Sequence, residues 1–316
     1  MQITHGFTSP DGPHALTIGN FDGLHRGHLA MLEKLKAEAS RRGLPACVLT
    51  FEPHPREFFS PAQAPTRLTS LREKAELLQT AGVDRLHVFR FNRAFAALTP
   101  QAFIEQALVR TLGARWILVG DDFRFGAKRA GDFALLKAAG NQHGFEAESL
   151  PTVTVEGVRS SSTAVREALA DGDMDRAARL LGRPYSITGR VFHGDKLGRS
   201  IGFPTANIQL RHNRPPLSGI YVVEVWGVAS TPLQGVASLG VRPTVHANGR
   251  PTLEAFIFNL DRDLYGQRLR VDFLKKLRDE EKYPDLSSLV AQIKLDVSNA
   301  KSYFANAHGD SRHPDQ

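Results

Sequence analysis

Cysteine and long apolar runs are almost missing from this sequence. Cys47 is the only cysteine among 316 residues, which excludes a disulfide within the chain, and it lies in the apolar stretch "ACVLTF", which is typical of a buried strand. No segment approaches the roughly 20 consecutive apolar residues that a membrane-spanning helix needs. The first residues also lack the charged and apolar regions of a signal peptide. We therefore expect a soluble, cytoplasmic protein that does not bind membranes.

Long basic tracts are missing as well, although the chain is basic overall. Its 40 Lys and Arg residues outnumber 33 Asp and Glu residues, and the net charge of +7 favours anionic ligands. The basic residues occur singly or in pairs such as Arg41 and Arg42, without the clusters of a nucleic-acid-binding tail. We therefore expect small phosphorylated ligands and no nucleic acid.

The first part of the chain alternates short apolar runs with helical patterns. The apolar runs are "ALTIGNF", "PACVLTF", "RLHVFRF" and "RWILVG", and the helical patterns that follow them lie at 27–41, 69–81, 100–112 and 132–143. This order predicts an α/β domain over residues 1–183, with a parallel sheet covered by helices on both faces. Ligands of such sheets bind at the carboxyl ends of the strands.

After "LLGRPYS" the pattern changes to strands of period two. Turn residues separate the runs "SITGRVF", "GIYVVEVWGVA", "LQGVASLGV", "TLEAFIFNL" and "RLRVDFL". These runs predict a small antiparallel sheet or barrel over residues 184–306, closed by one helix over 284–304. We place the boundary near Gly182, and we expect the polar residues 307–316 to be disordered.

The stretch "GNFDGLHRGH" joins the first predicted strand to the first predicted helix. The glycines at 19, 23 and 27 let a ligand approach the backbone, and His25 and His28 can donate hydrogen bonds to phosphate oxygens at the helix N-terminus. From this motif alone, a Gly-rich structural turn with exposed histidines is an equal alternative. The chain has no GxxxxGK[ST] sequence and no third ligand at a spacing suited to zinc, so we expect neither a P-loop nor a zinc site.

A second polar helix start, "RSSSTAVREAL", follows near the end of the first domain. It places Ser162 and Thr163 at a helix N-terminus, with Arg159 before them and Arg166 one turn inside. A plain Ser/Thr N-cap would explain the hydroxyls. Hydroxyls, cations and a helix N-terminus together also form a cradle for the polyphosphate leaving group of a nucleotide.

These motifs resemble those of a known family. "IGNFDGLHRGH", "LTFEPHPRE", "VGDDFRFG" and "SSTAVREAL" are similar, in order, to the FMN adenylyltransferase half of the bifunctional riboflavin kinase/FAD synthetases. "GRVFHGDKLGRSIGFPTANI", "GVASLGVRPTV" and "LRDEEKY" resemble the riboflavin kinase half. The resemblance covers residues 14 to 304. It implies a Rossmann-like nucleotidyltransferase domain followed by a riboflavin kinase-like β-barrel with a C-terminal helix.

For the first half, the resemblance implies transfer of AMP from ATP to FMN, which gives FAD and pyrophosphate. The residues implied for ATP and its phosphates are Gly19, Phe21, His25, Gly27, His28, Arg159, Ser162, Thr163 and Arg166. Of these, His25 and especially His28 would hold the transferring phosphoryl group. On the flavin side the candidates are His54, Asp122 and Phe123, although His54 between two prolines could form an inert turn and Asp122 could be an exposed loop acid.

For the second half, the resemblance implies phosphorylation of riboflavin by ATP with Mg²⁺. Thr205 and Asn207 in "GFPTAN" offer the hard oxygen ligands that Mg²⁺ prefers, although this stretch alone would more often form a turn. The preceding residues Gly194, Lys196, Gly198 and Gly202 are the candidates for wrapping the phosphates of ATP.

Glu254 is the candidate general base of the kinase half. Strand alternation places it on the same face as Phe256, an unusual neighbour for a carboxylate on a solvated face. A salt bridge with Arg270 of the next predicted strand is the structural alternative. The resemblance adds Arg278 on the flavin side, while Phe256 and Arg242 depart from the residues that the family usually carries there.

Three other functions stay open at this point. A nucleotidyltransferase for another phosphorylated acceptor would share the histidine motif, with only one half acting on flavins, but the kinase-like second half argues against it. An RNA-binding relative of the aminoacyl-tRNA synthetases would need a KMSKS-like loop, which the chain lacks. A flavin-storage protein would not need the intact candidate residues. We therefore expect an enzyme that binds riboflavin, FMN, FAD and ATP, with at most transient homo-oligomers.

Overall fold

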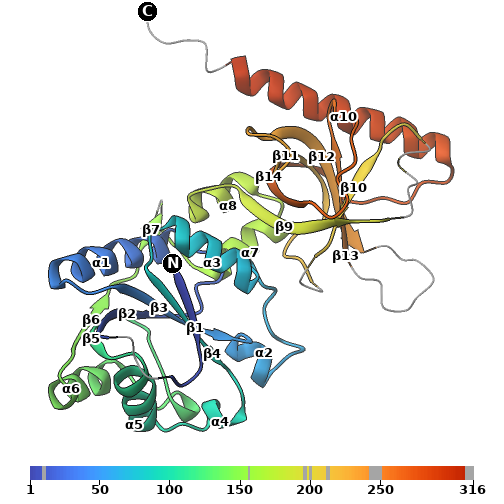
Figure 1. The fold of residues 1–316 in the computed structure, drawn as a ribbon. Helices are drawn as coiled ribbons and strands as arrows, with labels where there is room; N and C mark the ends of the chain where they lie inside the picture. The colour runs from blue at the N-terminus through green and yellow to red at the C-terminus, as the bar shows by residue number, and fades with distance from the viewer. Residues whose placement is uncertain are drawn as a thin grey trace, which may run out of the picture. The chain divides into compact units, whose positions relative to one another are not determined.

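The chain forms two compact units in the computed structural model (Figure 1). The first unit comprises Met1–Pro65 and Thr69–Ser162, and the second Thr66–Leu68 and Thr163–Gln316. The structure describes residues 1–8, 12–155, 157–194, 198, 201–210, 214–241 and 251–309. Lys196, Arg242 and most of the expected tail, from 310 onward, lie outside the described residues.

The first unit is built on a six-stranded parallel sheet with the order β1-β4-β3-β2-β5-β6. Its strands are β1 (Gln2–His5), β2 (His14–Ile18), β3 (Ala46–Glu52), β4 (Arg85–Arg90), β5 (Ala114–Gly120) and β6 (Glu146–Leu150). The predicted parallel sheet is confirmed. β2 lies between β3 and β5 with all of its residues buried, so the loop after β2 starts at the middle of the sheet. The sequence did not predict β1 and β6, which are polar edge strands.

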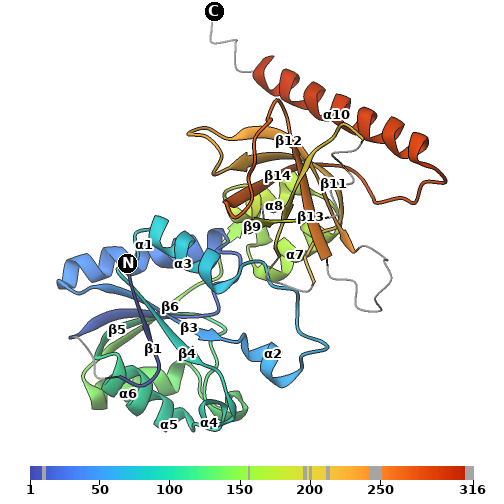
Figure 2. The same cartoon turned by 45° about the vertical axis from the view of Figure 1, so that its right-hand side comes forward.

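Helices cover both faces of this sheet, as Figure 2 shows. They are α1 (Arg26–Arg42), α2 (Pro55–Phe59), α3 (Leu71–Thr80), α4 (Arg93–Ala96), α5 (Pro100–Ala102), η1 (Phe103–Thr111), η2 (Ala127–Arg129) and α6 (Phe133–His143). Val48 and Trp116 pack with α1 and α3 on one face, whereas Leu49 and Ile117 pack with η1 and α6 on the other. Because neighbours on a strand face opposite sides, both must be apolar, which explains the continuous apolar runs.

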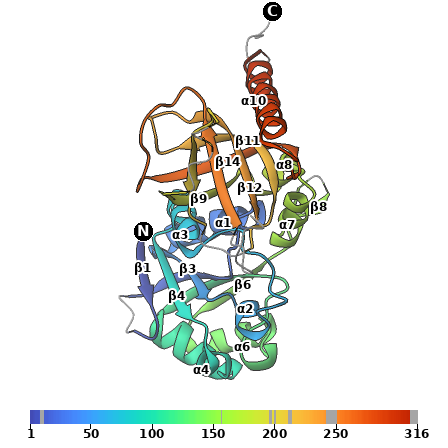
Figure 3. The same ribbon diagram turned by 90° about the vertical axis from the view of Figure 1, so that its right-hand side faces the viewer.

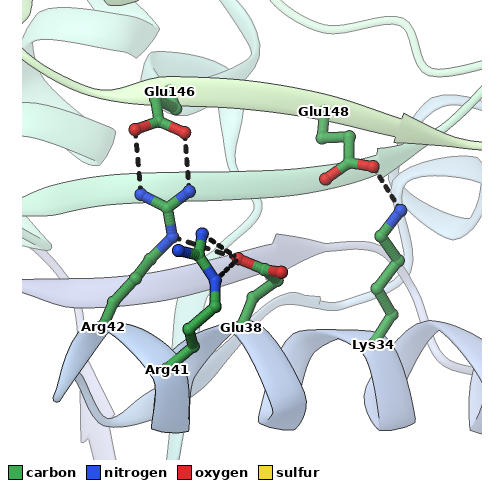
Figure 4. A network of polar contacts seen from close by, with 6 residues as sticks. All are labelled: Lys34, Glu38, Arg41, Arg42, Glu146 and Glu148. Atoms are coloured by element: carbon green, nitrogen blue, oxygen red, sulfur yellow. Dashed lines mark hydrogen bonds and ion pairs between the residues drawn. The ribbon is translucent and has the colours of Figure 1, made fainter.

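Ion pairs attach α1 to the edge strand β6 (Figure 4). Arg42 donates two hydrogen bonds to Glu146, at 3.0 and 2.6 Å, and Lys34 contacts Glu148. Each partly exposed pair contributes little stability. Together they link α1 to β6. Because α1 follows the loop after β2, its N-terminus lies just after the carboxyl end of β2.

The second unit is built on a closed six-stranded barrel with the order β10-β13-β12-β11-β14-β9. Its strands are β9 (Tyr185–Phe192), β10 (Thr205–Ile208), β11 (Gly219–Trp226), β12 (Leu233–Val241), β13 (Pro251–Ile257) and β14 (Arg268–Arg278). The predicted barrel is confirmed, and the paired strands are antiparallel. The sequence missed β10, because "TANI" is short and follows a Gly-Pro-rich stretch.

In the part of the second unit that the structure describes, three longer helices accompany the barrel. The helix α10 (Leu286–Gly309) runs alongside the barrel in Figure 3, where Ala300 and Phe304 pack on Ile220 and Val236. The helices α7 (Ser162–Ala170) and α8 (Met174–Leu181) precede the barrel, and a short hairpin of β7 (Thr154–Val155) and β8 (Val158–Arg159) leads into α7. α8 contacts β9 and β14.

Candidate active sites

The loop between β2 and α1 holds two histidine rings face to face. His25 is the N-cap of α1 and His28 lies in its first turn, with the ring centroids 3.7 Å apart and the planes 24° apart. Phe21 packs on His28 at a centroid distance of 4.8 Å. A Cβ atom on Gly19 would lie 3.1 Å from the Phe21 ring, so the glycine makes room for this stack.

The same loop has a strained backbone that a neighbouring segment holds in place. Phe21 and Leu24 adopt positive φ angles of 48° and 44°, which costs on the order of 1–3 kcal/mol each for residues with a side chain. Asp22 between them accepts hydrogen bonds from the backbone N–H and the hydroxyl of Thr69, at 3.0 and 3.1 Å. The N–H of Gly23 donates to the Thr69 hydroxyl at 3.1 Å. Strain that is held by such contacts is typical of a functional loop.

The segment before α7 meets this loop within the first unit. The Ser160 hydroxyl lies 3.3 Å from His25 Nδ1 and accepts a hydrogen bond from the Gly27 N–H at 3.3 Å. Ser162 Oγ donates to the Asp22 carbonyl at 2.9 Å. The structure therefore brings together the two polar motifs that the sequence singled out for phosphate binding.

Buried positive charge surrounds His28. Burial, followed by the charges of His25 and Lys74, holds the pKa of His28 well below its usual value of 6.5, so the ring is neutral near pH 7. Its Nδ1 atom is buried and has no hydrogen-bond partner among the described residues. Lys74 of α3 is 5% exposed and donates to the Thr50 hydroxyl at 3.4 Å. An anion bound at this loop would meet both the ammonium charge and the free N–H groups of α1.

The two arginines of the second motif contact other parts of the protein. Arg159 pairs with Asp122 at 2.7 Å, and both side chains are exposed. Arg166 Nε donates to the Thr66 carbonyl at 2.6 Å within the second unit, in which Thr163 also lies. Their binding of a leaving phosphate stays a prediction.

Two of the candidate flavin residues have local structural partners. His54 is the N-cap of α2, where its Nδ1 accepts a hydrogen bond from the Arg56 N–H at 3.1 Å, and Glu57 accepts one from the His54 N–H at 3.2 Å. Phe123 stacks on Phe125, with ring centroids 5.3 Å apart. A flavin contact by either residue stays a prediction.

In the barrel, three polar side chains form a row across three strands. Asn207 of β10 lies opposite Glu254 of β13, and Glu254 lies opposite Ser238 of β12. Thr205 Oγ1 donates to Glu254 Oε2 at 3.4 Å. Leu253 and Ala255, on either side of Glu254, are buried completely, which confirms the predicted alternation of faces.

Glycines fit closely around this row. A Cβ atom on Gly194 would lie 2.5 Å from the Asn207 side chain, and one on Gly198 would lie 3.3 Å from Thr205 Oγ1. Gly202 has a φ angle of 86°, which favours glycine. A cavity of about 380 Å³ opens beside the row, with Gly194, Thr205 and Asn207 in its wall. Gly194 and Gly198 thus lie near the candidate Mg²⁺ ligands.

Arg270, the partner suggested for a salt bridge with Glu254, pairs with Asp272 at 2.9 Å and lies over the Trp226 ring at 4.7 Å. The role of Glu254 as general base stays a prediction. The remaining candidate on this side, Arg278, pairs with Asp296 of α10 at 2.7 Å.

Sequence reasoning missed several residues of these sites. Lys74 lies in a segment whose pattern predicts only an amphipathic helix, and Thr69 lies just before the observed helix α3. Ser238 lies in an ordinary strand pattern. Ser160 stands inside the motif that we singled out, but Ser and Thr residues crowd that motif and nothing local distinguishes it. Only strand register and tertiary packing identify these four residues.

Comparison with known proteins places both units in one family. The family model described as FAD synthetase matches residues 8–164, and the model described as riboflavin kinase matches residues 181–304. The chain is 51% identical over 296 residues to the bifunctional riboflavin kinase/FMN adenylyltransferase of Escherichia coli K12, covering 94% of each chain. It is 46% identical to the protein of the same name from Pseudomonas fluorescens, covering 98% of this chain and all of that one.

A solved structure has the same fold over almost the whole chain. The crystal structure of a protein named macrolide-efflux protein, from Streptococcus pneumoniae, has a TM-score of 0.78 and 31% identity, and the match covers 94% of this chain and 97% of that one. In the described part of our chain, no helix is both long and apolar enough to cross a membrane. The order of the two matching family models and the full-length relatives agree with the motif order in the sequence. The chain therefore belongs to the family of bifunctional riboflavin kinase/FMN adenylyltransferases.

Proposed function

We propose that this protein makes FAD from riboflavin in two ATP-dependent steps. In the first, the barrel unit transfers the γ-phosphoryl group of ATP to riboflavin, which gives FMN and ADP. In the second, the parallel-sheet unit transfers AMP from ATP to FMN, which gives FAD and pyrophosphate. The observation that carries the proposal is the presence of two separate polar constellations, one in each unit, in a chain whose full-length relatives carry both activities in their name.

For adenylyl transfer, the stacked histidines position the reacting phosphoryl group. The phosphate of FMN attacks the α-phosphorus of ATP, so the protein contributes chiefly orientation and charge stabilisation. His28 is neutral and donates a hydrogen bond to an α-phosphate oxygen, while the Ser160 contact orients His25 beside it. Gly19, Phe21 and Gly27 shape the loop so that phosphates reach the N–H groups at the start of α1.

Release of pyrophosphate and binding of FMN use the side chains around this loop. We assign the leaving phosphates to the four residues of the second motif, namely Arg159, Ser162, Thr163 and Arg166. The direct contact of Ser162 with the loop supports this assignment. We assign the flavin side to His54, Asp122 and Phe123, which follow the carboxyl ends of β3 and β5.

For the kinase step, the row on the barrel holds the nucleotide and the acceptor. The cavity beside Gly194 takes ATP, whose phosphates pass Gly198 and Gly202, with Lys196 assigned to the same role. Glu254 accepts the proton of the riboflavin 5′-hydroxyl as that oxygen attacks the γ-phosphorus, and its contact with Thr205 brings it beside the phosphate site.

Mg²⁺ fits the oxygen donors of this row. Thr205 Oγ1 and the Asn207 side chain lie beside the glycines and the cavity, and hard oxygen donors are the ligands that this ion prefers in proteins. Thr205 and Asn207 would hold Mg²⁺ together with the phosphates of ATP. When bound, the ion neutralises charge on these phosphates.

We also propose the organisation in which both steps occur. The proposed functional boundary at 183/184 lies near the start of the riboflavin kinase match at 181. The compact units divide earlier, between Ser162 and Thr163, so α7 and α8 belong to the second unit. We propose that the enzyme acts in the cytoplasm on small molecules, without nucleic acid or membranes, and with at most transient homo-oligomers. The scattered basic residues and the single cysteine support this setting.

Incubation of the full chain with riboflavin, ATP and Mg²⁺ tests the proposal. Chromatography over time should show FMN first and FAD afterwards, with ADP and pyrophosphate as the other products. FMN without FAD would contradict the adenylyltransferase assignment. A parallel reaction that starts from FMN should give FAD and pyrophosphate without ADP.

A further inference from the structure

The loop after β14 is fastened to α10 by a buried ion pair. Arg278, the last residue of β14, donates from Nε to Asp296 Oδ1 at 3.0 Å and from Nη2 to Oδ2 at 2.7 Å. Asp296 is 3% exposed, and Gln292 donates to its Oδ1 at 3.0 Å. Arg278 Nη1 donates to the Asp279 carbonyl at 2.9 Å. All three nitrogens of Arg278 donate hydrogen bonds within the protein, so Arg278 holds the backbone of the loop.

The strand pairing is irregular at the end of β14, where Arg278 turns towards α10. Ile220 of β11 pairs with Arg278, whereas the next residue, Tyr221, pairs with Lys276, so β14 carries an additional residue here. Such β-bulges bend a strand and redirect its side chains. The bulge and the ion pair together determine where the chain continues after Arg278.

The loop then places Glu280 on the polar row of the barrel. Ser238 Oγ donates to Glu280 Oε1 at 3.0 Å. A Cβ atom on Gly240 would collide with the same carboxylate, so the glycine leaves the space that Glu280 occupies. Glu280 is exposed, and a ligand can therefore reach it.

Ser238 therefore connects Glu280 to Glu254 along the polar row. Ser238 is the direct cross-strand neighbour of Glu254, and such neighbours have Cβ atoms roughly 4.5–5.5 Å apart. Carboxylates accept hydrogen bonds, and a chain of hydroxyl groups that lies along this row can donate to both Glu254 and Glu280. The ribityl chain of riboflavin carries four hydroxyls, of which the terminal one reacts.

We propose that Glu280 binds the ribityl hydroxyls next to the one that Glu254 deprotonates, and that the Arg278–Asp296 ion pair positions Glu280 for this contact. Glu280 thus recognises the ribityl chain of the substrate, and Arg278 and Asp296 are positioning residues. The inference rests on the proposed riboflavin kinase function of the barrel unit.

Glu280→Gln tests the contact in the full chain, because it keeps the shape of the side chain and removes its charge. Hydrogen bonds to charged groups are worth roughly 1.5–3 kcal/mol, which corresponds to about a 10- to 100-fold effect. We expect the riboflavin KM of FMN formation to rise at least about 10-fold, with a smaller change in kcat and an unchanged KM for ATP. Glu281→Gln is the matched control, because Glu281 is exposed and contacts the Tyr283 hydroxyl at 3.5 Å. It should keep wild-type constants.

Lumiflavin distinguishes the ribityl chain from the ring, because it has the isoalloxazine ring and no ribityl hydroxyls. Flavin fluorescence should show that Glu280→Gln weakens riboflavin binding about 10-fold and leaves lumiflavin binding as in the wild type. Equal weakening of both ligands, or a riboflavin affinity within twofold of wild type, would overturn the proposal.

Asp296→Asn tests the positioning role. It should raise the riboflavin KM by a similar factor, and the double variant with Glu280→Gln should resemble either single variant, because both changes remove one contact. If the increases in the riboflavin KM multiply in the double variant, Asp296 acts independently of Glu280. Circular dichroism and an unchanged KM for ATP in FMN formation report whether the barrel unit of each variant is folded. If the wild type forms no FMN, the proposed kinase function fails, whereas the fluorescence comparison still tests Glu280.

Discussion

Ser160 Oγ and His25 Nδ1 lie 3.3 Å apart although 135 positions separate the two residues in the sequence. The same hydroxyl accepts a hydrogen bond from the Gly27 N–H. One side chain thus orients an imidazole and satisfies an N–H in the first turn of α1.

Ser160→Ala should therefore slow FAD formation modestly. A neutral hydrogen bond contributes about 0.5–1.5 kcal/mol, so the loss of the contact with His25 predicts roughly a 2- to 13-fold lower rate from FMN and ATP. Steady-state assays of FAD formation measure the change. Ser40→Ala on the exposed side of α1 is the control and should behave as wild type. A wild-type rate for Ser160→Ala would show that His25 needs no orientation by this hydroxyl.

His28→Ala should have a much larger effect on the same step. It removes a donor aimed at the charge that develops on the phosphoryl group, and the loss of one such donor typically lowers the rate ~10²–10³-fold. FMN formation from riboflavin, measured in the same preparation, should stay near wild type. Equal loss of both activities would indicate misfolding or one shared site.

Lys74→Met should raise the pKa of His28. The Lys74 charge disfavours the protonated ring, so its removal lets the ring bind a proton at higher pH, while burial still keeps the pKa below 6.5. NMR titration of the histidine ring signals measures the shift. Lys36→Met, on α1 itself, is the matched control and should leave the His28 titration unchanged. An unchanged His28 pKa in Lys74→Met would mean that the ammonium group lies farther away in solution.

Glu254→Gln should slow the kinase step alone. It keeps a hydrogen-bonding oxygen but loses basicity, which predicts a kcat for FMN formation lower by roughly 10²–10⁴-fold. Riboflavin binding should change little, and FAD formation from added FMN should be unaffected. Full kinase turnover in this variant would assign Glu254 a structural role.

His87 should make the first unit sensitive to acid. Burial lowers its pKa to about 4, below the 6.5 of the unfolded chain, so the unfolded state takes up a proton first as the pH falls below 6.5. Between pH 7 and pH 5 this contributes a loss of about 2 kcal/mol in the free energy of unfolding. In His87→Gln that part of the pH dependence should vanish.

Urea unfolding at the two pH values measures this difference. The fluorescence of the buried Trp116 reports on the first unit in a Trp226→Phe background, in which the other tryptophan is removed. Identical pH dependence with histidine or glutamine at position 87 would contradict the shifted pKa.

Much of the fold follows from local patterns in the sequence. The apolar runs predicted β2, β3, β4 and β5 because a central parallel strand must be apolar on both faces. Period-two alternation predicted the barrel strands and the face of Glu254. The strands that escaped prediction are the polar edges β1 and β6 and the short β10, whose hydrogen bonds come from neighbours distant in sequence. Local pattern carries no information about such pairing.

The residues of the candidate sites also fall into two groups, those indicated by local sequence and those that only tertiary contacts identify. Motifs indicated His25, His28 and Thr205 as candidates, and strand alternation indicated Glu254. The contacts of Ser160, Lys74 and Glu280 depend on where separate segments meet. Arg278 shows the difference, because its motif was visible in the sequence whereas its partner Asp296 could be identified only from the packing of α10.

The closed ring of barrel strands limits how this protein can change during evolution. Asn207, Glu254 and Ser238 are aligned by the registers of β10, β13 and β12. In a closed ring a one-residue insertion within any strand cannot be absorbed at a free edge, and it shifts side chains to the opposite face. Lineages should therefore gain and lose residues in the connecting loops, while the lengths of these strands stay constant.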